Sequence, residues 1–299
     1  MLDPRIRTLI TVCETGSFTR AAETLNLTQP AVSQQIRQME QELDVRIFNR
    51  CKKQLILTSE GELVLRYARR MDALYQNLRQ RLKNDRQHVT HIRVAITHTA
   101  ESNAVAEALA KLGSTHEGVT ISLISDTIRN CYEMLENYEV DLAVVEGHVT
   151  DNRYNALLLD TDQLVLAVAT DHPLAHKSLI TIEQLRREKL ILRRPNSGTR
   201  NLFVAHLESN NMTIDDFNVI LEVDNVATIK DLVRRNFGVS ILPKSACLDE
   251  LKKGKMIVLP VENLSMIREI NILYRPDFEH MNVLQDLMRI YSDTVRTYL

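Results

Sequence analysis

Apolar residues recur three and four positions apart through the first 45 residues, which is typical of amphipathic helices. A first helix is expected over residues 4–14 and two more between residues 17 and 42. Their apolar stripes are Ile6, Leu9, Ile10 and Cys13, then Phe18, Ala21, Ala22 and Leu25, and finally Val32, Ile36, Met39 and Leu43. Each stripe needs a core, so the first helix is expected to pack behind the other two.

The residues between the second and third helices are typical of a tight turn. Asn26 suits the left-handed conformation that ends a helix, Thr28 suits an N-cap, and Pro30 suits the first turn of the next helix. Two helices joined in this way form a helix-turn-helix, whose second helix enters the major groove of DNA.

The third helix carries a polar row on the side away from its apolar stripe. Gln29, Ser33 and Arg37 form the row, Gln34 lies beside it, and no carboxylate interrupts it. Glutamine can pair with adenine edges, arginine with guanine, and serine with either base or with phosphate. A polar row alone is usually a solvated helix face, so the prediction rests on the row together with the turn and the basic segment that follows.

Residues 45–58 predict a two-stranded wing. Leu55 and Leu57 alternate with polar positions, as in a strand with one buried face. The basic residues of this segment are Arg46, Arg50, Lys52 and Lys53. A basic tip would rest on the phosphate backbone or reach into the minor groove, although Lys52 and Lys53 are equally typical of an ordinary solvated turn.

A long helix is expected over residues 58–83. Its apolar edge is longer than a small winged domain can cover, so we expect a second copy of the chain to pair with it. Packing against the rest of its own chain is the alternative. The residues that recur at helical spacing are Leu63, Tyr67, Arg70, Leu74, Leu78 and Leu82. Residues 84–90, which are polar, are interpreted as a hinge.

From residue 91 the pattern changes to short apolar runs alternating with helical patterns. Strands that alternate with helices predict α/β units with parallel sheets, and some 210 residues of this pattern favour two lobes. The expected strands are 92–96, 119–124, 140–145, 164–169, 190–192, 219–223, 239–242, 256–261 and 270–274, and the expected helices include 100–112, 129–137, 199–208 and 226–235.

Three loops at strand ends are candidates for a ligand site, because open α/β sheets bind ligands there. Residues 97–101 offer Thr97, His98 and Thr99 near a helix start, where hydroxyls and free N–H groups could hold a carboxylate, phosphate or sulfate. Residues 146–148 offer Glu146 and His148. Residues 193–200 combine flanking arginines, a glycine and two hydroxyls directly before a helix, which is typical of an anion site; the residues expected to bind are Ser197, Thr199 and Arg200.

Plainer interpretations of these residues stay open. Ser197 and Thr199 could simply cap the helix, and Arg200 could form a structural ion pair. His98 and His148 could meet across the cleft, but no third ligand is evident, so no metal site is expected.

Charge is distributed unevenly along the 299 residues, whose net charge is -2. Residues 1–90 hold 15 Lys and Arg against 10 Asp and Glu, a balance of +5, and the remainder holds 22 against 29, a balance of -7. A positive excess in the part with the DNA-binding pattern would attract phosphate, although chance can produce an imbalance of this size.

The sequence gives no support to an enzyme. The second part lacks GxGxxG, GxxxxGK[ST], GxSxG and HExxH motifs, so neither a catalytic residue nor a cofactor is expected. Cys13, Cys51, Cys131 and Cys247 form no CxxC pair, which favours reduced thiols. A redox sensor would need two neighbouring cysteines, and Cys131 and Cys247 lie far apart in the sequence. The absence of an 18-residue apolar run and of a signal-like start predicts a cytoplasmic protein without a membrane segment.

Residues 1–61 resemble the LysR-type transcriptional regulators. The resemblance rests on residues 18–22, 27–33, Ile36, Leu43, 48–50 and 57–61. It implies a winged helix-turn-helix over 1–61, a linker helix over 58–86 that forms a dimer, and an effector-binding domain over 90–299 that resembles type 2 periplasmic binding proteins. Within that domain it implies lobe one over 90–161 and 269–299 and lobe two over 162–268, with crossings near 160–162 and 266–268.

The resemblance also implies roles for individual residues and for the assembly. Arg20 and Arg50 are expected to touch DNA, and the loop at 195–200 matches a subgroup in which it faces the effector. Family members are expected to form a dimer of dimers, a homotetramer, and often to control their own gene. Together the residues and the resemblance predict a sequence-specific transcriptional regulator that is switched by a small, anionic metabolite bound between the lobes.

Overall fold

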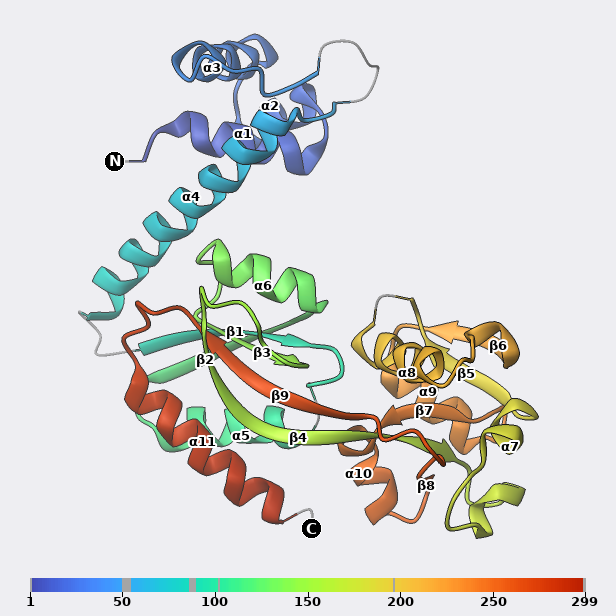
Figure 1. Ribbon diagram of the computed structural model, residues 1–299. Helices are drawn as coiled ribbons and strands as arrows, with labels where there is room; N and C mark the ends of the chain where they lie inside the picture. The colour runs from blue at the N-terminus through green and yellow to red at the C-terminus, as the bar shows by residue number, and fades with distance from the viewer. Residues whose placement is uncertain (1, 50–54, 86–89, 102, 196, 298–299) are drawn as a thin grey trace. The chain divides into compact units, whose positions relative to one another are not determined.

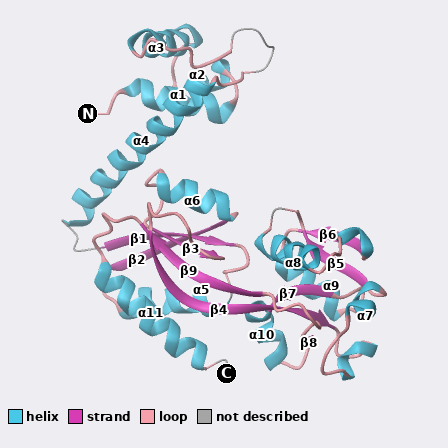
Figure 2. Cartoon of the chain, in the orientation of Figure 1, coloured by secondary structure: helices cyan, strands magenta, loops and turns pink. Residues whose placement is uncertain are grey.

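A computed structural model describes residues 2–49, 55–85, 90–101, 103–195 and 197–297. The chain forms two compact units, which are described separately below. The first comprises Met1–Thr90 with Glu136–Glu139, and the second comprises His91–Leu135 with Val140–Leu299. The first unit is helical, whereas the second combines helices with sheets (Figure 2).

The helices of the first unit confirm the predicted ones. They are α1 Pro4–Thr15, α2 Phe18–Leu25, α3 Gln29–Glu42 and α4 Ser59–Asp85. Asn26 adopts the left-handed conformation with φ 54°, and its backbone N–H closes the end of α2. Thr28 caps α3 by accepting a hydrogen bond from the backbone N–H of Ala31, and Pro30 lies in the first turn. The turn of the helix-turn-helix is therefore specified by local side-chain chemistry.

The core of the first unit lies between the helices. Leu9, Val12 and Val32 are fully buried within it. Gly61, at the start of α4, lies so close to the preceding segment that an added Cβ would stand 2.1 Å from the backbone oxygen of Ile47. Only glycine fits at this crossing, which brings the chain before α4 against the helical core.

The prediction for Leu43 was wrong. Val32, Ile36 and Met39 are buried as expected, but Leu43 is 48% exposed. The helix α3 ends at Glu42, so Leu43 is the C-cap residue and does not continue the buried stripe.

The predicted wing is described at its base. Phe48 and Leu57 form an antiparallel bridge, and the N–H of Asn49 donates to the oxygen of Ile56 at 2.9 Å. The ring of Phe48 meets that of Phe18 edge to face, with centroids 5.6 Å apart, which attaches the hairpin to α2. The expected tip residues Arg50, Lys52 and Lys53 lie outside the described residues, as do Cys51 and residues 86–89 of the expected hinge.

The helix α4 carries an apolar stripe that is open to solvent in the single chain. Its residues lie four, four, three, four and four positions apart, so they share one face of the helix. They are Leu63, Tyr67, Met71, Leu74, Leu78 and Leu82, each between 46% and 59% exposed.

The second unit contains the predicted alternation of strands and helices (Figure 1). Its strands are β1 Thr90–Thr97, β2 Val119–Asp126, β3 Leu142–Glu146, β4 Asn155–Val168, β5 Lys189–Arg193, β6 Asn218–Val223, β7 Ser240–Pro243, β8 Ile257–Leu259 and β9 Ile267–Tyr274. Its α-helices are α5 Asn103–Thr115, α6 Ile128–Glu136, α7 Ile182–Arg186, α8 Gly198–Ser209, α9 Val226–Arg234, α10 Lys244–Lys252 and α11 Met281–Arg296, and its 3-10 helices are η1 Pro173–His176 and η2 Ile214–Asp216. The sequence pattern did not identify α7, α10 or α11.

The expectation of parallel sheets was only partly correct. Strands β1 and β3 pair in parallel, as do β5 and β6. Strand β4, however, is antiparallel to β7, β8 and β9, and β3 is antiparallel to β9. The cause is that β9 and the 14-residue β4 run in opposite directions through the second unit and that β3, β7 and β8 pair onto them, which gives a mixed sheet.

Four hydrophobic clusters of described residues lie against β4 and β9. Two of them draw on residues 92–154 and 270–291, and the other two draw on residues 164–266. We call the surroundings of the first two clusters lobe one and those of the other two lobe two. Strands β4 and β9 run side by side from lobe one to lobe two (Figure 1), and their pairing continues through Asp160↔Ile270 to Gln163↔Ile267.

Candidate DNA interface and effector site

The polar row of α3 is exposed in the first unit. Gln29, Gln34 and Arg37 are exposed and Ser33 is half-buried. Gln29 donates to Ser33 at 2.9 Å, whereas within the described chain Gln34 and Arg37 have no hydrogen-bond partner. Side chains with unused donors and acceptors are what direct readout of base edges requires.

Other predicted DNA contacts surround this row. Thr28 and Pro30 are exposed at the start of α3, and Arg20 is exposed on α2, where its backbone N–H donates to the N-cap Ser17.

At the start of α4 the pKa of Glu60 is below its usual range, because its own backbone N–H and then the Ser59 hydroxyl donate to it. A negative charge at the start of a helix is favourable, so the Glu60 carboxylate stabilises the first turn of α4.

The second unit holds a cavity of about 330 Å³ between lobe one and lobe two. Lobe one contributes His98, Thr99 and Glu101 to its lining. Lobe two contributes Asp224 and Lys230, together with apolar and amide side chains from the same region. The first predicted loop therefore lines the cavity.

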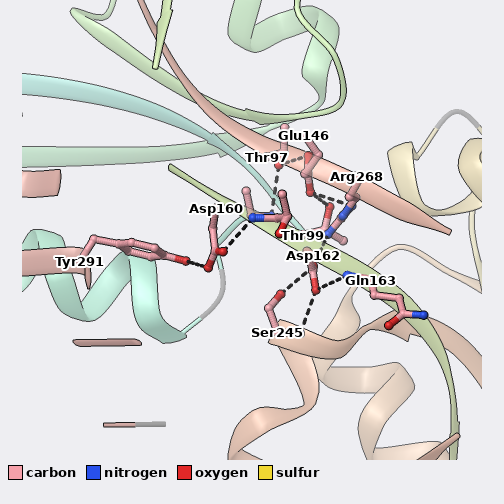
Figure 3. Close-up of polar contacts among 11 residues, drawn as sticks. Thr97, Thr99, Glu146, Asp160, Asp162, Gln163, Ser245, Arg268 and Tyr291 are labelled. Carbon is pink, nitrogen blue, oxygen red and sulfur yellow. Dashed lines mark hydrogen bonds and ion pairs between the residues drawn. The ribbon is translucent and has the colours of Figure 1, made fainter. Parts of the chain in front are cut away.

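Thr97, Thr99 and Glu146, from the first and second predicted loops, lie together and bind one another (Figure 3). Because β1 and β3 are parallel neighbours, their carboxyl ends lie at the same edge of the sheet, which brings Thr97 beside Glu146. The hydroxyls of Thr97 and Thr99 each donate to a different oxygen of the Glu146 carboxylate. All three residues are buried.

The carboxylate of Glu146 also belongs to a buried ionic cluster (Figure 3). Arg268 Nη1 lies 3.1 Å from a Glu146 oxygen, and Arg268 Nη2 donates to Asp162 at 3.0 Å. Asp162 in turn accepts from the backbone N–H of Ser245 at 3.2 Å and from its hydroxyl at 2.8 Å. The cluster thus links β3 and β9 to the start of α10, which packs with lobe two.

Arg268 and Asp162 were missed as site residues, although the sequence placed the lobe crossings at these positions. Charged residues inside otherwise apolar strands were the available signal, since a buried charge requires a partner.

The two histidines do not form a metal pair. His98 is exposed and lines the cavity. His148 is exposed, and its Nδ1 lies 3.5 Å from Glu269. The pKa of Glu269 is lowered, first by a hydrogen bond from Asn271 and then by His148. Among the described residues, no cluster of three or more His, Cys, Asp or Glu side chains is arranged to hold a metal.

The third predicted loop lies at the start of α8. Ser197 is the N-cap, accepting from the backbone N–H of Arg200 at 3.2 Å. The guanidinium of Arg200 is buried and bonds Glu222 at 3.1 Å, so the ion pair that the sequence left open is present. Thr199 is buried, and its hydroxyl has no hydrogen-bond partner in the described chain. Asn196 lies outside the described residues.

Arg193, at the end of β5, was not among the predicted binding residues. Its side chain is only 4% exposed, and Nη2 donates to Asp224 at 3.1 Å. Its Nε and Nη1 have no partner within the described residues. A buried guanidinium with unused donors is a strong candidate for an anion site, because leaving such donors unpaired is costly.

The two cysteines of the second unit, Cys131 and Cys247, give no support to a redox site. Cys131 and Cys247 are buried in the cores of different lobes. Burial raises the pKa of both thiols to about 12. The thiolate is the reactive form, so both groups are poorly suited to oxidation near neutral pH.

Within the described residues, no helix combines the length and apolar character needed to cross a membrane.

Comparisons with known families agree with this two-part organisation. The family described as "Bacterial regulatory helix-turn-helix protein, lysR family" matches residues 4–62, and "LysR substrate binding domain" matches residues 85–296. A probable RuBisCO transcriptional regulator of Cyanophora paradoxa is 28% identical and covers 98% of this chain and 90% of its own. The regulator CysL of Bacillus subtilis is 25% identical over 92% of this chain and 91% of its own.

Solved structures share the fold. Full-length CbnR complexed with its target DNA is 18% identical, with a TM-score of 0.71, and covers 98% of this chain and 100% of its own. The regulatory domain of Synechocystis CcmR in complex with 2-PG is 22% identical, with a TM-score of 0.59, over 68% of this chain and 97% of its own.

Proposed function

The chain belongs to the LysR family of DNA-binding transcriptional regulators, which are not enzymes, and from that premise we propose that a small anionic metabolite switches it by binding between the lobes. The observation that carries the proposal is the buried Arg193 guanidinium, whose nitrogens Nε and Nη1 have no partner in the described chain. Its one partner, Asp224, lines the cavity between the lobes.

The anion would bind on lobe two. Near Arg193, the hydroxyl of Thr199 is also buried without a partner in the first turn of α8. Unused N–H groups and the dipole at a helix start both favour a negative charge. The solved complex of CcmR with 2-PG supports the proposal that the corresponding region of this chain binds a small molecule.

The predicted site residues are retained as part of this proposal, with Thr97, Thr99 and Glu146 as a wall of the effector site whose polar groups bind one another. The other residues proposed for the effector site are His98, His148, Ser197, Thr199 and Arg200. The residues proposed for DNA are Arg20, Thr28, Gln29, Pro30, Ser33, Gln34, Arg37, Arg50, Lys52 and Lys53. The domain boundaries also remain as proposed, with lobe two spanning residues 162–268.

Switching would act through the arrangement of the lobes. A ligand can move an equilibrium between two arrangements only by binding one of them more tightly. The paired strands β4 and β9 are the connections that would bend, because the chain crosses between the lobes within them. A changed arrangement would alter how subunits pack and hence the spacing and bending of their DNA.

The exposed stripe of α4 is proposed as the dimer interface. Pairing along this stripe would place two recognition helices on two half-sites, and two dimers would then assemble into a tetramer. Leu78→Glu would put a charge in the stripe, and we expect dimers to dissociate in light scattering after size exclusion, while circular dichroism stays unchanged. An unchanged mass would exclude α4 as the interface. We also propose a cytoplasmic location, because a transcriptional regulator must reach its DNA.

The proposed function is tested by fluorescence anisotropy on the DNA upstream of the chain's own gene. Scrambled DNA of equal length is the control, and a salt series measures the phosphate contribution. We expect tight binding with a large preference for the upstream DNA. Small carboxylates and phosphates are then screened for a shift in affinity. Thr199→Val should weaken the response to an active anion, and an unchanged response would place the effector elsewhere.

A further inference from the structure

The hydroxyl groups of Thr97 and Thr99 have no hydrogen left to donate. A threonine hydroxyl carries a single hydrogen, and both of these point to the carboxylate of Glu146 (Figure 3). Thr97 Oγ1 also accepts from the backbone N–H of Ala100 at 3.2 Å. A ligand anion would have to break these bonds before either hydroxyl could bind it.

The charge around these hydroxyls also disfavours an anion. Glu146, Asp162 and Arg268 are each at most 4% exposed at the side chain. Two carboxylates share one guanidinium, so the cluster carries a formal charge of -1 when all three are ionised. A second anion in this low-dielectric site would be repelled, since charges interact strongly where water is excluded.

We propose that Glu146 is an internal carboxylate that fills the anion position of lobe one and so determines the ligand class of the cleft. The effector presents its anionic group to lobe two and a cationic or neutral hydrogen-bond donor group to lobe one. This inference rests on the proposed function, because it concerns the same cleft.

The remaining cavity lining fits such a ligand. On lobe one, the carboxylate of Glu101 receives one hydrogen bond from Ser125 and can accept more. On lobe two, Lys230 donates at 2.9 Å to both Glu250 and the oxygen of Ala246 and keeps a third N–H. Behind the lining residue Asp224, the Nε and Nη1 of Arg193 have no partner within the described residues. An amphoteric molecule, such as an amino acid or an amide-bearing acid, could donate hydrogen bonds to lobe one and present its carboxylate to lobe two.

The first test removes the internal carboxylate and supplies it again from solution. Glu146→Ala removes the atoms that acetate contains, so acetate should enter the hole and bind Thr97, Thr99 and Arg268. We expect the melting temperature of the full-length variant to rise with acetate by about 3 °C or more and then saturate, relative to chloride at equal ionic strength. The wild type should show no saturable rise.

Two controls separate this from a general salt effect. Glu146→Gln keeps the side-chain volume and leaves no hole, so acetate should not stabilise it. Glu133→Ala removes a carboxylate from an exposed pair with Arg129 and likewise leaves no buried hole. An equal response of all variants, or none for a folded Glu146→Ala, would overturn the proposal.

The second test needs no substitution and covers the case in which Glu146→Ala fails to fold. Methyl resonances of threonine are followed in the wild-type chain while inorganic phosphate, sulfate or acetate is added. We expect Thr97 and Thr99 to stay unmoved. Saturable shifts at Thr97 and Thr99 would overturn the proposal even if Thr199 also moved. Thr199 reports separately on the proposed function: unmoved signals at all three residues would count against anion binding at lobe two while leaving the assignment of Glu146 intact.

Discussion

The polar face of α3 and the polar cluster around Glu146 both consist of side chains that can form hydrogen bonds. The first is exposed to solvent, whereas the second is buried. Gln34 and Arg37 are exposed, and their donors are unused within the described chain. Thr97, Thr99 and Glu146 are buried and bind one another. Both groups looked like binding residues in the sequence. The difference teaches that residue type suggests what a group can bind, whereas its existing partners decide whether it is free to do so.

The largest expected effect comes from removing the cation of the buried cluster. Arg268→Leu would leave Glu146 and Asp162 buried without their partner, at a cost of about 3–5 kcal/mol in the free energy of unfolding. Urea denaturation of the full chain, followed at the transition of the second unit, measures this loss. Arg129→Leu is the matched control, since its exposed i,i+4 pair with Glu133 contributes about 0.3–0.5 kcal/mol. Similar losses for both variants would show that the cluster is not a buried charge network.

Substitutions on the exposed polar face of α3 should weaken DNA binding without changing the free energy of unfolding. Gln34→Ala and Arg37→Ala should each lose about 1–3 kcal/mol of affinity for the specific DNA, and less for scrambled DNA. The urea midpoint should stay unchanged because both side chains are exposed. Anisotropy with both DNAs measures the difference. Equal losses on the two DNAs would assign the residue to phosphate contact instead of base readout.

A smaller loss of unfolding free energy is expected where a polar side chain caps a helix. Thr28→Ala removes the hydroxyl that accepts from Ala31 and should cost the first unit about 1 kcal/mol in unfolding free energy. Thr28→Ser retains the hydroxyl and should restore most of that loss. Thermal unfolding of the three proteins compares them. If Ser and Ala behaved alike, the threonine methyl group and not the cap would matter.

The smallest expected effect concerns the buried thiols. Burial raises the pKa of Cys131 and Cys247 to about 12, so at pH 8 both are protonated and only a minute fraction is thiolate. In a background that carries both Cys13→Ser and Cys51→Ser, Ellman's reagent should label neither of them before urea unfolds the second unit. Rapid labelling of the folded chain at Cys131 or Cys247 would reopen the redox interpretation.

Local chemistry explains what the sequence could predict. The left-handed Asn26, the cap at Thr28 and the buried stripe of α3 depend on residues a few positions apart. The local sequence therefore predicts them without knowledge of the tertiary structure. The stripe of α4 was predictable for the same reason, except that the predicted stripe contained Arg70 where the exposed apolar stripe contains Met71. The pattern of Val283, Leu284, Leu287 and Tyr291 on α11 was also available, although it was not used.

The cluster around Glu146 could not be predicted because its members are distant in the chain. Arg268 lies 122 positions after Glu146, and Ser245 lies 83 positions after Asp162. Their proximity depends on β3, β4 and β9 pairing in one sheet. Strand β4 was likewise recognised only at residues 164–169, although the short apolar run at residues 156–159 was available as a signal for its earlier and less buried half.

The strand order of the large sheet sets when it can form during synthesis. Strand β9 pairs with both β3 and β4, yet it is the last strand in the sequence. About 100 residues separate it from β4, which take about 5–20 s to translate at about 5–20 residues per second. During that interval β3 and β4 lack their shared neighbour, so their open edges can pair with other chains. Lobe two can fold as it emerges from the ribosome, whereas lobe one must wait for nearly the whole polypeptide.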